Sequence, residues 1–279
     1  MIEIDEVNFR YKNKANRILN DFTLKIEKGE ILGIIGPTGS GKSTICYLFN
    51  GLIPHNFSGD YSGSVYVNGR NVIQETVERM SGIIGYMLQE PSFQIASPFV
   101  ESEIAFGMEN FGLSFEEMDS RLNDILEKLS IEHLRNKSTS DLSEGEKQKV
   151  VLASILVMNP EILVLDESSS MVDSTSKKQL IKILKDLNEK ENKTIILVDH
   201  DLDFLSQITK RIVLINNGAI ISDGSTREIL TATKLLRENG LQPPVLVSLF
   251  EKFKDQSLQI KQLPLRLENA VKIAKSWLK

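Results

Sequence analysis

The sequence predicts an α/β fold that contains two kinds of β-sheet. Short apolar runs rich in β-branched residues, bounded by Gly, Pro or charged residues, are typical of strands buried on both faces, as in a parallel sheet. Such runs lie at residues 31–35, 82–88, 162–165 and 194–198. Near the N-terminus, apolar residues alternate with polar ones at 2–9 and 22–26, as in half-exposed antiparallel strands. We therefore expect a parallel core sheet and an antiparallel side sheet.

Helical spacing of apolar residues replaces the strand patterns in two parts of the chain. Between about residues 91 and 159 it predicts a helical insert between two buried strands. After residue 236, a Pro243-Pro244 pair opens a segment that fits two amphipathic helices. We expect one domain at 1–235, which includes the helical subdomain at about 91–159, and a C-terminal helical extension at 236–279.

Composition excludes several classes of protein. Of the 279 residues, 41% are hydrophobic and 25% are charged, which is ordinary for a globular chain. The net charge of −5 disfavours general binding to the nucleic-acid backbone, so we expect no nucleic-acid partner. Cys46 is the single cysteine, the N-terminus has no secretion-signal pattern, and no apolar run approaches the ~20 residues that span a bilayer. We expect a cytosolic chain that reaches a membrane only through a partner.

A glycine-rich segment follows the first buried strand and matches the pattern G-x-x-x-x-G-K-[ST] completely. Its residues are Gly36, Pro37, Thr38, Gly39, Ser40, Gly41, Lys42, Ser43 and Thr44. Glycines let backbone N–H groups curl round phosphate oxygens, and the next helix presents its positive end to them. We expect Lys42 to reach the β- and γ-phosphates and Ser43 to ligate Mg²⁺. A glycine-rich turn without a ligand is the alternative, and the full match in this context favours nucleotide binding.

Two carboxylates end the buried strand at 162–165. Successive side chains of a strand point to opposite sides, so Asp166 and Glu167 should have different roles in the site. We expect Asp166 to hold Mg²⁺, through water, and Glu167 to polarise the attacking water. Two acidic residues at a strand end are common and by themselves indicate no site. Together with the glycine-rich loop, they form a candidate site.

The order of the motifs resembles ATP-binding cassette (ABC) ATPases over about residues 1–235. The order is the glycine-rich loop, Gln89, a Leu-Ser-x-Gly-x segment at 142–146, the Asp166-Glu167 strand end, and His200 after another buried strand. The segment at 142–146 corresponds to the family signature LSGGQ and departs from it at Glu144 and Glu146. Ser143 and Glu146 also have the spacing of a helix capping box, and the two readings are compatible.

The resemblance implies a P-loop NTPase core of the ABC type with ATP and Mg²⁺ as cofactors, and it assigns further roles. Gln89 senses Mg²⁺ and the attacking water, and His200 contacts the γ-phosphate. Tyr11 stacks on adenine, and Asp173 belongs to a loop that couples two active sites. Ser143 and Gly145 complete the site of a partner subunit. The alternative for Gln89, His200 and Tyr11 is that each is an ordinary structural residue at the end of a strand.

Three segments look more specifically like the ATPases of energy-coupling factor transporters, which import vitamins and transition metals. They lie at 50–55, 87–91 and 100–110. This resemblance implies a second related ABC ATPase, preferably in a heterodimer, a transmembrane component, a substrate-binding membrane component, and a place on the cytoplasmic face of the membrane. The C-terminal extension would help the two ATPases pair. Glu101 and Glu103 are candidates to face basic residues of the membrane component, and exposed helix charges are the alternative.

Two rival functions remain at this point. One is a soluble ABC ATPase of DNA repair or translation, although no coiled-coil insertion, duplicated cassette or basic face is visible. The other is a small-molecule kinase, which would leave residues 142–146 and His200 without roles. We expect ATP hydrolysis that energises an import complex, with two unequal sites because of Glu144 and Glu146.

Overall fold

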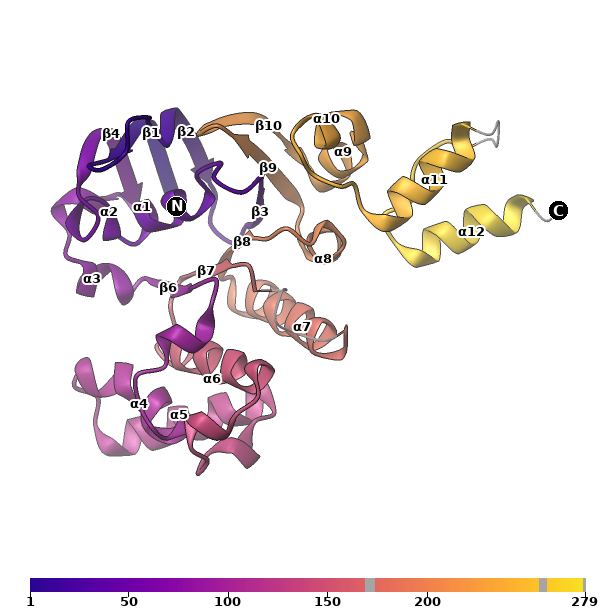
Figure 1. Cartoon of the computed structure of the whole chain (residues 1–279). Coiled ribbons are helices and arrows are strands. Elements are labelled where there is room, and N and C mark those ends of the chain that lie inside the picture. The colour runs from indigo at the N-terminus through magenta and orange to yellow at the C-terminus, as the bar shows by residue number, and fades with distance from the viewer. Residues whose placement is uncertain (169–173, 256–259, 278–279) are drawn as a thin grey trace.

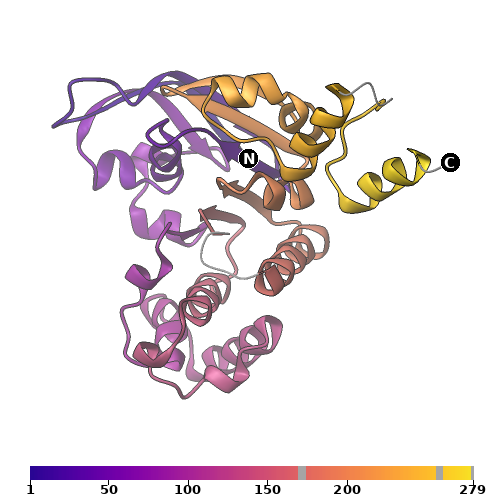
Figure 2. The same ribbon diagram turned by 45° about the vertical axis from the view of Figure 1, so that its right-hand side comes forward.

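The computed structural model describes residues 1–168, 174–255 and 260–277. Two sheets and their covering helices form the main body, a helical unit hangs from one side of it, and the C-terminal helices project from another side (Figure 1). Turning the molecule by 45° keeps the helical unit and the C-terminal helices apart (Figure 2). The expected arrangement of an α/β core with a side sheet and a helical insert is confirmed.

The core sheet has six strands in the order β10-β9-β3-β8-β7-β6. Its strands are β3 (Ile31–Ile35), β6 (Ile84–Met87), β7 (Ile162–Asp166), β8 (Thr194–Val198), β9 (Arg211–Asn216) and β10 (Ala219–Ser225). All pairs from β9 to β6 are parallel, whereas β10 runs antiparallel to β9. Every residue of β3, β7 and β8 is buried, as a parallel sheet covered on both faces requires.

The side sheet is antiparallel and has the order β2-β1-β4-β5. Its strands are β1 (Ile2–Tyr11), β2 (Leu19–Ile26), β4 (Gly59–Val67) and β5 (Arg70–Asn71). Ile2 stands opposite Ile26 on one side and Val67 on the other, and all three side chains are fully buried. These alternating apolar residues pack in one cluster with Leu32 and Ile34 of β3, which joins the two sheets.

Helices cover the core sheet and connect its strands. They are α1 (Lys42–Phe49), α2 (Leu52–His55), η1 (Val72–Gln74), α3 (Val77–Ser81), α7 (Ser174–Glu191), α8 (Leu202–Ile208), α9 (Thr226–Thr231) and α10 (Thr233–Glu238). The helix α1 follows β3 directly, so its N-terminus lies at the carboxyl end of a central strand. In open α/β sheets this edge is where ligands bind.

The helical unit lies between β6 and β7 in the sequence. It contains η2 (Pro91–Gln94), α4 (Val100–Asn110), α5 (Phe115–Leu129), η3 (Glu132–Leu134), η4 (Thr139–Asp141) and α6 (Glu144–Leu156). Arg135 joins two of these helices, because its guanidinium pairs with Glu101 of α4 at 2.6 Å and Asp119 of α5 at 2.9 Å. The apolar faces of α4, α5 and α6 belong to the same cluster as one face of the core sheet.

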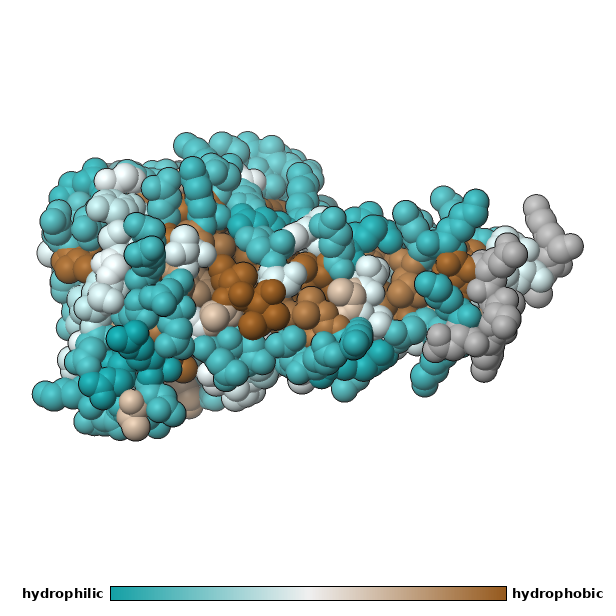
Figure 3. All heavy atoms as spheres, turned by 90° about the horizontal axis from the view of Figure 1, so that it is seen from above, coloured by the Kyte–Doolittle hydropathy of each residue, from teal (hydrophilic) through white to brown (hydrophobic). Residues whose placement is uncertain are grey.

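The C-terminal extension consists of α11 (Val245–Asp255) and α12 (Leu267–Trp277). Phe250, Phe253 and Trp277 form its own small cluster, with ring centroids 5.4 to 5.7 Å apart. Leu236 and Val247 still pack in the core of the main body, so the expected boundary between 235 and 236 falls inside α10. Seen from above, hydrophobic residues form a band from the body onto the extension, flanked by hydrophilic ones (Figure 3).

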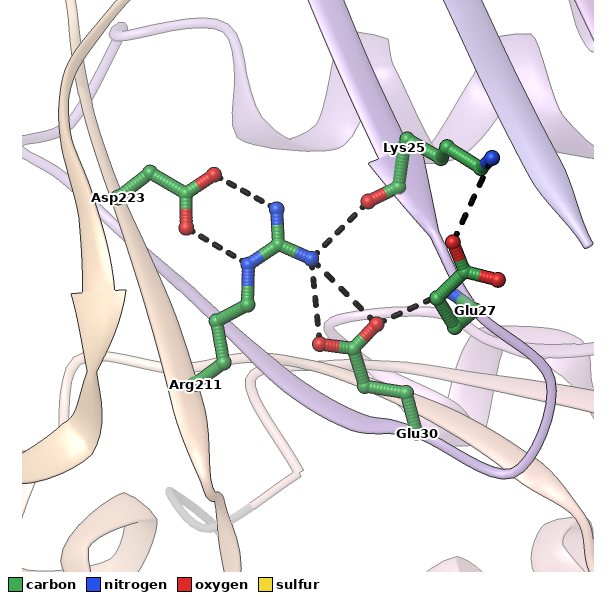
Figure 4. A network of polar contacts seen from close by, with 5 residues as sticks. All are labelled: Lys25, Glu27, Glu30, Arg211 and Asp223. Atoms are coloured by element: carbon green, nitrogen blue, oxygen red, sulfur yellow. Dashed lines mark hydrogen bonds and ion pairs between the residues drawn. The ribbon is translucent and has the colours of Figure 1, made fainter.

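Arg211 joins the two sheets through a polar network (Figure 4). From β9 its guanidinium forms two 2.6 Å hydrogen bonds to Asp223 of β10. It also donates to the carbonyl of Lys25 in β2, at 3.0 Å, and to Glu30, at 3.2 Å. The carboxylates raise the pKa of Arg211, and the hydrogen bonds hold the cation where the sheets meet.

Candidate functional site

The loop between β3 and α1 has a backbone that only glycine accommodates readily. Gly39 and Gly41 have φ angles of +80° and +106°, in the left-handed region. A Cβ on Gly36 would lie 2.2 Å from the carbonyl oxygen of Ile215, so this position has no room for a side chain. The hydroxyl of Ser40 is buried and has no hydrogen-bond partner among the described residues. The loop is therefore a tight cradle at the N-terminus of α1.

Lys42 is the first residue of α1, and its side chain folds back under the loop. Its ammonium donates hydrogen bonds to the carbonyl oxygens of Gly36, at 2.8 Å, and Pro37, at 3.0 Å. Burial lowers the pKa of Lys42, while the negative charges of Glu167 and Asp166 act in the opposite direction. A cation placed under a cradle of backbone N–H groups is suited to bind phosphate.

A cavity of about 640 Å³ opens beside the loop. Its lining residues are Tyr11, Lys14, Ala15, Asn16, Arg17, Ile18, Thr38, Gly39, Gly41, Lys42, Ser43, Thr44, Gln89, Glu167 and His200. The cavity brings Gln89, Glu167, His200 and Tyr11 together with most of the predicted loop. Four residues predicted for this site do not line it: Gly36, Pro37, Ser40 and Asp166. Sequence reasoning missed the segment 14–18, because it belongs to no motif. The available signals were its basic residues, Lys14 and Arg17, and its position three residues after Tyr11.

The two carboxylates at the end of β7 have different surroundings. Asp166 is only 3% exposed, and burial raises its pKa, although hydrogen bonds with Ser43 and Tyr86 oppose this. The Tyr86 hydroxyl lies 3.3 Å from Asp166 Oδ2 and was not predicted as part of the site. Glu167 has a φ of +52°, and a non-glycine residue in this region is strained, which is common at functional sites.

Three neighbouring strands deliver Gln89, Glu167 and His200 to one point. Gln89 follows β6, Glu167 follows β7 and His200 follows β8. The side-chain amide of Gln89 donates to Glu167 Oε2 at 2.6 Å, and His200 Nε2 lies 3.0 Å from Glu167 Oε1. Parallel strands end at the same edge of a sheet, so residues distant in sequence meet there. Glu167 is the centre of this group.

Tyr11 lies at the end of β1 and faces the same cavity. Its hydroxyl is 3.1 Å from the hydroxyl of Thr44 on α1. Its ring meets Phe9 edge-on, with centroids 4.8 Å apart. This places an aromatic ring at the cavity wall, next to the start of α1.

The segment at 142–146 lies at the N-terminus of α6 and lines no part of this cavity. Ser143 caps α6 and forms a complete capping box with Glu146. Glu144 pairs with Lys147 at 2.8 Å, so both departures from the signature have partners on their own helix. Gly145 is in the first turn of α6 and has open space around it. Asp173 lies outside the described residues.

Glu103 does not face outward, which corrects the expectation that it meets a membrane component. It is 6% exposed, and its carboxylate accepts the backbone N–H groups of Ala96, at 2.9 Å, and Ser97, at 2.8 Å. Buried carboxylates need such partners, so Glu103 organises the loop before α4. Glu101 is partly exposed, but Arg135 pairs with it.

Comparisons with known proteins agree with this geometry. The ABC transporter family model matches residues 19–170. The energy-coupling factor transporter ATP-binding protein EcfA1 of Streptococcus thermophilus is 35% identical over 259 residues, which cover 92% of each chain.

Solved structures with the same fold include ABC proteins. The structure of cbiO1 from Clostridium perfringens, described as part of the ABC transporter complex cbiONQ, has a TM-score of 0.75 and 28% identity, and the match covers 90% of this chain and 98% of that one. A dimeric, post-hydrolysis structure of the ATP-binding cassette MJ0796, bound to ADP and Pi, has a TM-score of 0.72 and 25% identity, with 81% and 99% covered. The chain therefore belongs to the ABC transporter family, as one of its ATP-binding and ATP-hydrolysing ATPases.

Proposed function

We propose that this chain is the ATPase subunit of an importer of the energy-coupling factor type, working in vitamin or transition-metal uptake. The observation that carries the proposal is the meeting of Gln89, Glu167 and His200 beside the Lys42 loop in one cavity. The names of EcfA1 and of cbiO1, part of the complex cbiONQ, support the type of transporter. Neither name favours the alternative of a soluble ABC ATPase in DNA repair or translation.

In this proposal the residues of the cavity divide the work of hydrolysis. Backbone N–H groups of residues 38–44 and the ammonium of Lys42 bind the phosphates, and Tyr11 stacks on the adenine. The carboxylate of Glu167 orients and polarises the attacking water. The amide of Gln89 and the imidazole of His200 hold that carboxylate in place, and His200 also contacts the γ-phosphate.

The residues present fit a Mg²⁺ ion that binds together with the nucleotide. Among the described residues, no cluster of three or more His, Cys, Asp or Glu side chains could hold a metal alone. Mg²⁺ is usually held by one or two carboxylates together with substrate phosphates and water. Ser43, Asp166 and Gln89 would hold it, with Asp166 acting through water. The ion would supply positive charge that stabilises the developing charge on the phosphates.

A second ABC ATPase would complete each site. The cavity contains the loop and Glu167 but no residue of the segment 142–146, so this chain's own signature is available to another subunit. The dimeric state described for MJ0796 supports such pairing. We propose a heterodimer, in which Ser143 and Gly145 of this chain face the partner's nucleotide and Asp173 couples the two sites. The extension at 236–279 would stabilise the pair.

Docking to the membrane would use the helical unit. No helix among the described residues is long and apolar enough to cross a bilayer. Large side chains that are 50% to 80% exposed gather in the helical unit: Phe93, Phe99, Phe106, Phe111 and Phe115. Contiguous exposed apolar patches mark interaction surfaces, and we propose that these side chains form one. We propose that they contact the transmembrane component, which joins a substrate-binding membrane component, and that the chain lies on the cytoplasmic face.

Co-expression with the membrane components tests this function. The chain should move to the membrane fraction, and ATP hydrolysis by the purified complex should depend on Glu167. Replacing Phe93 and Phe115 together by Ser should reduce co-purification several-fold. The control is Ile221→Ser on β10, which also alters a 45% exposed apolar residue but lies outside the helical unit. Equal co-purification of both variants would refute docking through the phenylalanines.

A further inference from the structure

Gln148 is a buried amide in the second turn of α6. It is 5% exposed, and its Nε2 donates a 2.5 Å hydrogen bond to the backbone carbonyl of Ser168. Ser168 directly follows Glu167, so this bond joins the helical unit to the backbone next to the central carboxylate of the cavity. Gln148 lies outside the signature segment 142–146, and Ser168 lies after the Asp166-Glu167 pair.

The hydrogen bond between Gln148 and the Ser168 carbonyl lies in apolar surroundings. The small, almost wholly apolar cavity beside it, about 30 Å³ in volume, is also lined by Met87, Leu152 and Leu180. The Gln148 Oε1 atom and the Ser168 hydroxyl are buried without a hydrogen-bond partner among the described residues. Burying unsatisfied polar atoms costs free energy, and an apolar side chain of the same size would avoid the cost of the amide. Packing alone therefore does not account for an amide here.

The backbone at Glu167 is held from two sides. On one side the N–H of Glu167 donates to the carbonyl of Val198 in β8, at 2.7 Å. On the other side the carbonyl of Ser168 accepts from Gln148. Glu167 itself has the strained φ of +52°, so its conformation depends on such external contacts. A shift of the carbonyl after Glu167 would turn the carboxylate relative to Gln89 and His200.

We infer that Gln148 is a positioning residue for Glu167, which makes the orientation of the catalytic carboxylate depend on the placement of α6. Gln148 lies five residues after the cap Ser143, which is about 7.5 Å along the helix axis. A rigid helix carries a displacement of its N-terminus to this contact. The Ser168 hydroxyl can donate and Gln148 Oε1 can accept, so a small shift of α6 has a further hydrogen bond available. This inference rests on the proposed role of Glu167 in hydrolysis.

The test replaces Gln148 by Met, which keeps the length of the side chain and removes the donor. We expect kcat for ATP to fall about tenfold, while KM for ATP stays within twofold of the wild-type value. The midpoint of urea unfolding should fall slightly, because the Ser168 carbonyl loses its donor. The matched control is Gln179→Met, which removes an exposed amide on α7 that accepts from Lys149. The control should leave kcat unchanged. Gln148→Leu, which also lacks the donor and carries no charge, provides a second variant should Gln148→Met fold poorly.

A double-mutant cycle shows whether the effect passes through Glu167. In the Glu167→Gln background, adding Gln148→Met should change the residual single-turnover rate by less than twofold and leave the Kd for ATP unaltered. An unchanged kcat in the single variants, an equal loss in the Gln179→Met control, or an additive loss in the double variant would overturn the inference. If instead the wild-type complex does not hydrolyse ATP, or Glu167→Gln hydrolyses it at the wild-type rate, the proposed function fails before Gln148 is tested.

Discussion

Glu146 accepts hydrogen bonds from the backbone N–H of Ser143, at 2.9 Å, and from the Ser143 hydroxyl, at 2.8 Å. These two bonds lower the pKa of Glu146, so it stays ionised. Its carboxylate is therefore engaged at the cap of its own helix, with Lys137 3.6 Å away. Glu144 is more exposed and has Lys147 as its partner. Both negative charges remain at the end of α6 that would meet a partner's phosphate.

Restoring the family signature should raise turnover at the partner's site. We expect Glu144→Gly combined with Glu146→Gln to increase that rate about threefold or more, because it removes two negative charges near the γ-phosphate. Gln at position 146 can keep the capping box, so the helix should stay intact. The measurement is the ATPase rate of heterodimers in which one site at a time is silenced by Glu167→Gln or its equivalent. An increase confined to the site built on Lys42, or a fully active native homodimer, would contradict the unequal-site proposal.

Substitutions of Lys42 and Glu167 should affect different steps, ATP binding and ATP hydrolysis respectively. Lys42→Ala removes the side-chain cation of the loop and should weaken ATP binding by more than about tenfold. Glu167→Gln keeps the size of the side chain and should retain ATP affinity, while hydrolysis falls by about a hundredfold or more. Isothermal titration gives the affinities, and phosphate release gives the rates. Wild-type hydrolysis by Glu167→Gln would show that another group activates the water.

Arg211→Met should destabilise the fold by about 2 kcal/mol, because it leaves Glu30 and Asp223 without their shared cation where the sheets meet. The side chains of Arg211 and Glu30 are only 27% and 15% exposed. Arg10→Met is the matched control, since Arg10 and its partner Asp60 are 41% and 72% exposed, and such pairs contribute little. Urea unfolding of both variants measures the difference. Equal losses would show that the network in Figure 4 adds no more than a surface pair.

Asp201 should make stability depend on pH. Burial by itself favours the neutral acid, but Lys177 at 2.6 Å and the N–H of Phe204 at 2.9 Å outweigh it, so the pKa of Asp201 lies below its usual value. A lowered carboxyl pKa contributes stability above the unfolded pKa, and this contribution disappears as pH falls through the folded pKa. We expect Asp201→Asn, which keeps a helix cap, to cost about 1 kcal/mol at pH 7 and progressively less below pH 4. A cost independent of pH would exclude the charge as its cause.

The main elements of the fold could be predicted from local patterns. The buried runs at β3, β7 and β8 and the alternation in β1 and β2 follow from which residues avoid water, a property readable along the chain. The glycine-rich loop could also be predicted from the sequence. Its backbone has positive φ angles at Gly39 and Gly41, and glycine adopts such angles more readily than other residues. Motif order also indicated that Gln89, Glu167 and His200 belong together.

Tertiary structure decided what the acidic side chains contact. Glu101 and Glu103 are two positions apart in one helix and look alike in the sequence, yet one pairs with Arg135 and the other is buried against two backbone N–H groups. Tyr86 contacts Asp166, Gln148 contacts the backbone after Glu167, and the segment 14–18 lines the cavity only because chain segments far apart in sequence pack together. Local sequence determines which elements form and which loops can cradle phosphate. The partners of a charged or amide side chain depend on three-dimensional distances and burial, which only the assembled sheets and helices set.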